Sequence, residues 1–114
     1  MRNQYKEHTF QNAAVATGNG TVLECYDAGA GPYSTLTIQV NGITTATITW
    51  EASVDGTNYV ATGVTSLADL STVATTATAD GLFRANVSGF LYFRARISAW
   101  TTGTITVKGV AITQ

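Results

Sequence analysis

The feature that most constrains the fold is a period-two alternation of apolar and polar residues, which recurs along most of the chain. Leu36, Ile38 and Val40 alternate with threonine and glutamine, and the pattern resumes at Ala46 and runs on to Val54. A strand places successive side chains on opposite faces of a sheet, so each such segment is expected to have one buried and one solvated face. Because helical periodicity is nearly absent, the alternation predicts an all-β protein.

Turn signals rich in glycine, asparagine and aspartate separate the alternating segments. Asn41-Gly42 is typical of a two-residue hairpin, and Ser88-Gly89 and Thr102-Gly103 mark later turns. This spacing predicts an antiparallel β-sandwich, jelly-roll-like, with about seven to nine short strands. We expect a single sandwich domain over residues 13–114. Residues 1–12 lack a strong pattern, and they are expected to form an N-terminal arm or an early edge strand.

Charge is scarce in this sequence and excludes several classes of protein. Six Lys and Arg residues stand against seven Asp and Glu residues, which gives a formal net charge of −1. Without a basic surplus, the chain is not expected to bind nucleic acid. No apolar run is long enough to predict a membrane-spanning helix, and the polar N-terminus does not resemble a signal peptide. A surface with so few charges gives little protection against self-association, so we expect other proteins to cover much of it.

Residue types that carry catalysis or bind metals are few. His8 is the one histidine and Cys25 the one cysteine, and nothing in the sequence places either beside a catalytic partner. The chain lacks the several His, Cys and acidic ligands of a zinc site. The segment 55–58 superficially resembles a calcium loop but lacks its spacing and closing Glu, so a turn is predicted there. We therefore expect no enzyme, no catalytic residues, no metal and no cofactor.

Arginine and aromatic residues gather in two neighbouring segments and form the candidate interface. Tyr92, Arg94, Arg96 and Trp100 share one parity, which predicts that all four point outward, and Arg84 lies in the segment before them. Tyrosine, tryptophan and arginine are the residues enriched in protein-interface hot spots. Trp100 has three interpretations: it closes the end of the sandwich, it contacts a protein, or it stacks on a sugar ring.

The register of these two segments predicts a conflict between like charges. A three-residue loop at Ser88-Gly89 keeps both faces consistent but sets Arg84 opposite Arg94, which would repel each other. Either an acidic side chain lies between them, or the two strands belong to different sheets across a corner. Glu51, outward on its own strand, is one candidate partner.

Several motifs carry a family resemblance. The run LTIQVNG at 36–42 is followed by ATITWEASVDGTNY at 46–59, and the C-terminal half adds FRARISAWTTGTITV at 93–107. With these motifs, the chain resembles the small β-sandwich structural proteins of tailed bacteriophage virions, of the capsid decoration (cement), head-fibre or tail accessory type. The resemblance covers most of residues 10–110.

The resemblance implies a virion component without catalytic activity. We expect a capsid decoration protein, made in the host bacterial cytoplasm, that binds and stabilises the outer surface of the head through protein contacts. Its partners would be the major capsid protein or neighbouring virion proteins, and it would form a homo-oligomer, with a trimer favoured. The alternatives are a carbohydrate-binding or host-adhesion module of a tail fibre or baseplate, and a non-viral secreted or surface sandwich domain. The N-terminal arm would dock on a neighbour by strand addition through Asn3, Gln4, Tyr5, Lys6 and Phe10.

Overall fold

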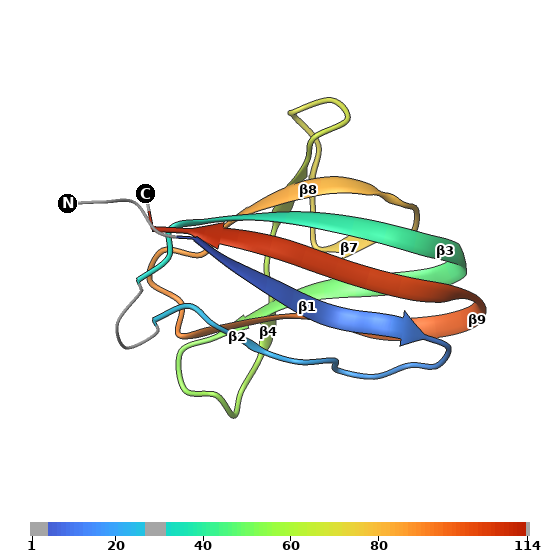
Figure 1. Cartoon of the computed structure of the whole chain (residues 1–114), viewed down its shortest axis with the longest axis horizontal. Coiled ribbons are helices and arrows are strands. Elements are labelled where there is room, and N and C mark those ends of the chain that lie inside the picture. The colour runs from blue at the N-terminus through green and yellow to red at the C-terminus, as the bar shows by residue number, and fades with distance from the viewer. Residues whose placement is uncertain (1–4, 27–31, 114) are drawn as a thin grey trace.

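The computed structural model describes residues 5–26 and 32–113, in which every regular element is a β-strand (Figure 1). These residues contain no helix that could cross a membrane. The strands pair antiparallel in the order β1-β9-β3-β8-β5-β6, with β2 on β9 and with β4 and β7 on β3. The prediction of an all-β antiparallel fold is confirmed. The strands are β1 (Tyr5–Ala14), β2 (Leu23–Glu24), β3 (Thr35–Ser53), β4 (Val60–Ala61), β5 (Val64–Ser66), β6 (Val73–Ala74), β7 (Thr76–Ala77), β8 (Gly81–Asn86) and β9 (Tyr92–Ile112).

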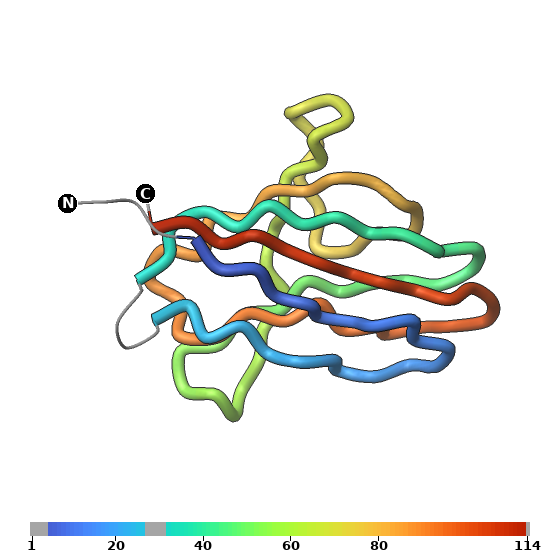
Figure 2. Tube along the Cα trace, in the orientation of Figure 1, coloured from blue at the N-terminus to red at the C-terminus, as the bar shows by residue number. Residues whose placement is uncertain are grey.

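Two long strands, β3 and β9, pair along their whole length and form the centre of the fold. Their ladder runs from Thr35 opposite Ile112 to Ser53 opposite Tyr92. The paired strands bend back at mid-length, so that one half of the ribbon lies over the other half (Figure 2). We expected short, separate strands here, with a hairpin at Asn41-Gly42. That prediction of strand length was wrong, because the chain bends at this point and continues in the same strand.

Glycines and one aspartate make the bend. Gly42 and Gly103 adopt positive φ angles of 93° and 124°, and a Cβ on Gly42 would lie 1.8 Å from the carbonyl oxygen of Thr104. The bend interrupts the ladder and leaves backbone donors of β3 to be satisfied by other groups. Two of these N–H groups donate to the carboxylate of Asp80: that of Gly42 to Oδ2 at 3.1 Å, and that of Ile43 to Oδ1 at 2.8 Å.

The folded ribbon creates two layers with the core between them. The front layer contains β1, residues 104–112 of β9, residues 35–41 of β3, β8, β5 and β6, and the back layer contains β2, the other halves of β9 and β3, β4 and β7. Aromatic pairs join the layers: Phe10 of β1 packs edge-on against Phe93 of β9 at 5.9 Å, and Trp50 of β3 lies 5.3 Å from Phe83 of β8. Both Trp50 and Phe93 are fully buried.

The N-terminal segment is the edge strand of the front layer from Tyr5 onward. Its ladder with β9 runs from Tyr5 opposite Ile112 to Ala14 opposite Ile105. We expected residues 1–12 to form either an arm or an early edge strand. From residue 5 onward they form an edge strand, so the prediction of an arm was wrong for these residues. Phe10 of this strand belongs to the core and Ala14 packs against it, which the polar residues around them did not indicate.

The turn at Ser88-Gly89 passes from one layer to the other. Phe90 N donates to the carbonyl of Val87 at 3.1 Å, which closes the turn. The strand before it, β8, pairs with β3 and β5 in the front layer and does not pair with β9. The expected register of β8 on β9 was wrong. The two segments lie in different layers, as the corner alternative required, but both layers belong to one continuous folded sheet and are not separate sheets.

Candidate functional site

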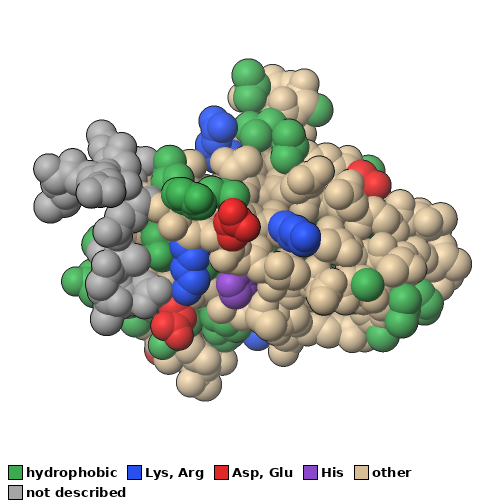
Figure 3. Space-filling view, viewed as in Figure 1, with side chains coloured by type: hydrophobic (Ala, Val, Ile, Leu, Met, Phe, Trp, Pro, Cys, Tyr) green, Lys and Arg blue, Asp and Glu red, His purple; other side chains and the backbone are tan. Residues whose placement is uncertain are grey.

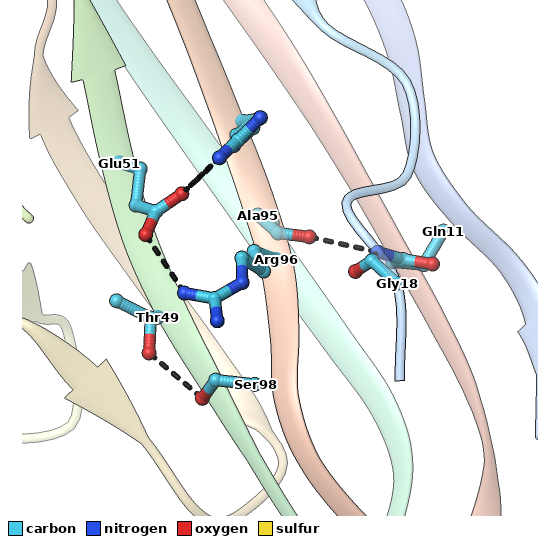
Figure 4. A network of polar contacts seen from close by, with 8 residues as sticks. Gln11, Gly18, Thr49, Glu51, Ala95, Arg96 and Ser98 are labelled. Atoms are coloured by element: carbon cyan, nitrogen blue, oxygen red, sulfur yellow. Dashed lines mark hydrogen bonds and ion pairs between the residues drawn. The ribbon is translucent and has the colours of Figure 1, made fainter. Parts of the chain in front are cut away.

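The back layer carries a cluster of charged and aromatic side chains on its solvent-facing side. Glu51 of β3 lies directly opposite Arg94 in the ladder, and Arg96 follows two residues later on β9. Arg94 Nε donates to Glu51 Oε1 at 2.8 Å, and Arg96 Nη1 donates to Glu51 Oε2 at 3.0 Å (Figure 4). Each carboxylate oxygen therefore has its own guanidinium. Glu51 is therefore a partner of Arg94, as expected, but it does not lie between Arg94 and Arg84.

Tyr59 covers the inner of the two arginines. The Arg94 Cζ atom lies 3.8 Å from the centroid of the Tyr59 ring, which is a cation–π contact. The side chains of Glu51 and Arg94 are 9% and 16% exposed, whereas that of Arg96 is 40% exposed. Two guanidinium groups against one carboxylate leave a net positive charge, and Arg96 presents it to solvent in a fixed position.

Tyr92 extends this surface onto the turn that follows β3. A Cβ on Gly56 in that turn would lie 3.0 Å from Tyr92 Cε2. Asp55 Oδ1 accepts hydrogen bonds from the N–H groups of Asn58 and Thr57, both at 2.8 Å, and these bonds hold the pKa of Asp55 well below its usual range. The predicted turn is confirmed. We call Glu51, Tyr59, Tyr92, Arg94 and Arg96 the back-face cluster.

Trp100 points toward the core side of the sheet. It stands opposite the buried Ala46, whereas Ile97 stands opposite Ile48, so β9 has one extra residue between these two pairs. This β-bulge reverses the alternation before Trp100, so the outward placement predicted from parity was wrong. The indole packs partly against the core, and its Nε1 donates to the carbonyl of Gly103 at 3.0 Å. It closes the end of the sandwich, as one of the three interpretations held.

Arg84 lies on the other side of the molecule from the back-face cluster. On β8 it stands opposite Thr37 of β3, and both side chains are on the solvent-facing side of the front layer. The predicted interface therefore separates: Tyr92, Arg94 and Arg96 come together, whereas Arg84 and Trp100 do not join them. The layer crossing at residues 88–91 places Arg84 on the opposite side, and the bulge in β9 turns Trp100 toward the core.

The solvent-facing side of the front layer is broad and carries charges of both signs, as Figure 3 shows in the view of Figure 1. A hollow of about 380 Å³ lies in it, between side chains that include Glu7, Leu82 and Lys108. We call this side the front face. Its side chains are Tyr5, Glu7 and Thr9 of β1, Lys108, Val110 and Ile112 of β9, Thr35, Thr37 and Gln39 of β3, and Leu82, Arg84 and Asn86 of β8.

The described residues among those predicted as a docking arm do not form one common surface. Phe10 is 1% exposed and belongs to the core, so it is not available to dock on a neighbour, and its prediction is corrected. Tyr5 is exposed on the front face, and Lys6 is half-buried on the same strand. Asn3 and Gln4 lie outside the described residues.

His8 and Cys25 are the two side chains best suited to catalysis, and both make structural contacts. His8 packs edge-on against Phe10 at 4.5 Å, its Nε2 lies 3.1 Å from Thr21 Oγ1, and desolvation lowers its pKa. Cys25 is buried, and burial raises the pKa of its thiol to about 12. Within residues 5–26 and 32–113, no group of three or more His, Cys, Asp or Glu side chains could hold a metal ion.

Two polar residues that make contacts between distant segments, Gln11 and Tyr59, were not predicted from the sequence. Gln11 is buried, and its Nε2 donates to the carbonyls of Ala95 at 2.9 Å and Gly18 at 3.2 Å, so it ties the segment after β1 to β9 (Figure 4). Tyr59 is the second of these residues, and in the sequence it directly follows the predicted turn at 55–58. Its contact with Arg94 could have been found from the turn at 55–58, which returns the chain alongside β3 and Glu51.

Comparisons with known proteins give one family and one fold. The sequence matches the model of the XepA family over residues 4–111. No curated protein matches the sequence. The crystal structure of the SPBc2 prophage-derived protein YomS is similar, with a TM-score of 0.87 and 19% identity over 99% of this chain and 96% of YomS. That of the PBSX exported protein XepA has a TM-score of 0.89 and 17% identity, over 99% of this chain and 39% of XepA. The chain thus spans less than half of PBSX XepA, and at these identities the likeness is one of fold.

Proposed function

The chain belongs to the XepA family, and from this membership we propose that it is a phage-derived structural protein that acts by binding other proteins on the virion. In its specific form, the proposal is a decoration protein on the exterior of the head, bound to the major capsid protein or to a neighbouring virion protein. It catalyses no reaction and needs no cofactor.

Phage origin and an exterior place have support from the relatives. YomS is described as prophage-derived, and PBSX XepA as an exported protein. The resemblance to small phage proteins that the sequence carries agrees with both descriptions. An exported relative supports a role outside the cytoplasm, and the outer surface of a virion is one such place.

The observation that carries the proposal is the construction of the back-face cluster. Glu51 fixes Arg94 and Arg96 through separate oxygens, and Tyr59 covers Arg94. A guanidinium that is already held in place loses little conformational entropy when a partner binds. Arg96 and Tyr92 reach the surface beside this fixed centre, and arginine and tyrosine are enriched where protein interfaces gain most of their energy. The cluster is therefore a candidate contact with an acidic surface of a virion protein.

Absence of catalysis is supported by the state of the two reactive residues. His8 is held by Phe10 and Thr21, and the raised pKa of Cys25 keeps its thiol protonated at neutral pH. A nucleophile needs a base within hydrogen-bond reach, and the polar contact of the Cys25 Sγ is with the carbonyl of Leu23 at 3.9 Å.

Co-sedimentation with particles of the phage that encodes the chain tests the proposal. We expect the wild-type protein to sediment with particles that lack it, and Arg96→Ala to bind at least tenfold more weakly, which is about 1.4 kcal/mol. Lys108→Ala removes an exposed cation from the opposite face and serves as the matched control. Wild-type protein that stays in the supernatant contradicts the virion role, whereas full binding by Arg96→Ala contradicts the role of the back-face cluster.

A carbohydrate-binding function is the second candidate, because of a hollow beside Trp100. Its volume is about 310 Å³, and its side chains are hydroxyls and apolar groups without charge. It is lined by Thr44, Thr45, Ala46, Thr47, Thr78, Ala99, Trp100 and Thr101. Trp50 is fully buried, so a change in tryptophan fluorescence on adding neutral oligosaccharides would report on Trp100. Saturable quenching that is lost in Trp100→Phe supports this candidate, and unchanged emission rejects it.

A further inference from the structure

The dipeptide Asn-Gly occurs twice in the chain, at residues 19–20 and 41–42. In such a dipeptide the backbone nitrogen of the glycine can attack the side-chain amide of the asparagine, because glycine has no Cβ to obstruct the approach. All four residues are exposed, and both glycines have positive φ angles, 69° at Gly20 and 93° at Gly42. Solvent access and glycine conformation are therefore similar at the two sites, so a difference in reactivity has to come from the contacts of each dipeptide.

The dipeptide at 41–42 is restrained in two ways. The N–H of Gly42 donates to Asp80 Oδ2 at 3.1 Å, and Asn41 stands opposite Thr106 in the ladder of β3 and β9. Attack on the Asn41 side chain needs the Gly42 nitrogen to lose its proton and the Asn41 backbone to rotate. The carboxylate opposes the first step, because a negative charge beside the nitrogen disfavours a second one. The ladder opposes the rotation.

The dipeptide at 19–20 lies between β1 and β2, outside any strand. Within the described part of the chain, the N–H of Gly20 has no hydrogen-bond partner. A Cβ at this position would lie 2.2 Å from the carbonyl oxygen of Phe10, which explains why residue 20 is glycine. Neither of the two restraints at Asn41 applies here.

We propose that Asn19 deamidates spontaneously in the folded protein, whereas Asn41 is protected. The Gly20 nitrogen forms a bond to Asn19 Cγ, the bond from Cγ to Nδ2 breaks, and Nδ2 leaves as ammonia with the proton of the Gly20 N–H. Water then opens the resulting succinimide ring. Attack at Cγ gives aspartate, and attack at the backbone carbonyl carbon gives isoaspartate, in which the chain continues through Cγ. Both products carry one added negative charge, and the modification is independent of the proposed function.

Isoaspartate at residue 19 lengthens the chain between two anchors. On one side, Gly18 and Ile97 exchange backbone hydrogen bonds of 3.1 and 2.9 Å, and Gln11 Nε2 donates to the Gly18 carbonyl at 3.2 Å (Figure 4). On the other side, the N–H of Thr21 donates to the carbonyl of Phe10 at 3.0 Å. One additional backbone carbon in the two-residue span between these anchors is expected to loosen their hydrogen bonds.

Peptide mapping of the purified chain after long incubation at neutral pH tests the proposal, with mass spectrometry to follow each asparagine. In the folded chain, Asn19 is expected to convert at least roughly tenfold faster than Asn41, which corresponds to about 1.4 kcal/mol. In urea, where the contacts of both dipeptides are lost, the two rates are expected to become similar. Equal rates in the folded chain, or faster loss of Asn41, would overturn the proposal. So would a folded chain in which Asn19 is stable, or a difference that persists in urea.

Asp80→Ala tests the cause of the protection at Asn41. It removes the acceptor of the Gly42 N–H, so the conversion of Asn41 is expected to accelerate toward the rate of Asn19. Glu24→Ala removes an exposed carboxylate elsewhere and is the matched control, in which Asn41 should stay protected. An unchanged rate at Asn41 in folded Asp80→Ala would contradict the role of the carboxylate. The comparison within the wild type does not require this variant to fold.

Amide hydrogen exchange on the separated isoaspartate fraction tests the effect on the two anchors. Exchange of the Thr21 and Ile97 N–H groups is expected to be faster than in the unconverted protein, because local opening becomes easier. Asn19→Asp adds the same charge without lengthening the backbone, so it is the matched control and should exchange as slowly as the wild type. Equal protection in the isoaspartate fraction and the wild type would contradict the loosening.

Discussion

Glu51 is the residue on which the back-face cluster depends. It binds both Arg94 and Arg96 while its own side chain is 9% exposed. Glu51→Gln keeps the shape but removes the charge, and leaves two neighbouring guanidinium groups without a counter-ion. We expect the free energy of unfolding to fall by about 1–3 kcal/mol, below the cost of breaking a fully buried pair because Arg96 is partly solvated. Urea unfolding measures this, with exposed Glu24→Gln as control, and a neutral effect would contradict the pairing.

His8 makes stability depend on pH in a window of its own. Its pKa in the folded chain is lowered from 6.5, mainly by desolvation. The unfolded chain therefore takes up the proton more readily, and stability that is full above pH 6.5 is lost as the pH falls toward the folded pKa. Asp55 and Asp69 titrate only at lower pH, because hydrogen bonds lower both pKa values, that of Asp69 to about 2.

Thermal unfolding between about pH 7.5 and pH 5 checks this assignment, since other side chains with ordinary pKa values change charge little there. The melting temperature of the wild type is expected to drop across the window. His8→Gln, which does not titrate, is expected to show a flat profile. Parallel profiles for the two proteins would mean that another group causes the dependence.

For single residues, the sequence predicts which face of the sheet a side chain occupies better than it predicts which groups that side chain contacts. The alternation over residues 46–54 puts Trp50 on the apolar face, and Glu51 and Arg94 were both expected to point outward; the structure agrees on all three. It failed at Trp100, because a bulge of one residue cannot be seen in the alternation of a single strand. It also gave no sign of Gln11, whose burial depends on backbone carbonyls brought near it by the fold.

The element that determines the architecture is the bent ribbon of β3 and β9. Gly42→Ala would place a Cβ 1.8 Å from the carbonyl oxygen of Thr104 at a φ of 93°, so we expect a loss of more than about 2 kcal/mol in unfolding free energy. Gly18→Ala is the matched control, because nothing lies within 4 Å of its added Cβ. Denaturant unfolding compares the two. Equal, small effects would mean that the bend tolerates a side chain.

The sequence predicts the strands but not the way two of them are joined. Asn41-Gly42 indicates a change of chain direction, and a hairpin or a bend within one strand satisfies that signal equally well. The outcome depends on distant groups: Gly103 bends the partner strand at the same level, and Asp80 accepts the two freed N–H groups. Such non-local partners are not readable from one segment, and so the strands were expected to be short.

Across the whole molecule, several of the few charged side chains lie on two opposite faces. On the back face, arginines are neutralised in part by Glu51, and on the front face Glu7 and Arg84 stand at opposite ends of one row across the strands. The sequence indicated one arginine and aromatic patch, whereas the layer crossing after β8 distributes the arginines over two faces.

The most direct test of the proposed function is an electron cryo-microscopy map of purified phage particles, from the phage that encodes this chain and from a deletion of its gene. We predict density on the outer surface of the wild-type particle that fits the two-layer fold, with the back face toward the virion, and its loss in the deletion. A wild-type map identical to that of the deletion, with the protein found free of particles, would contradict a virion role.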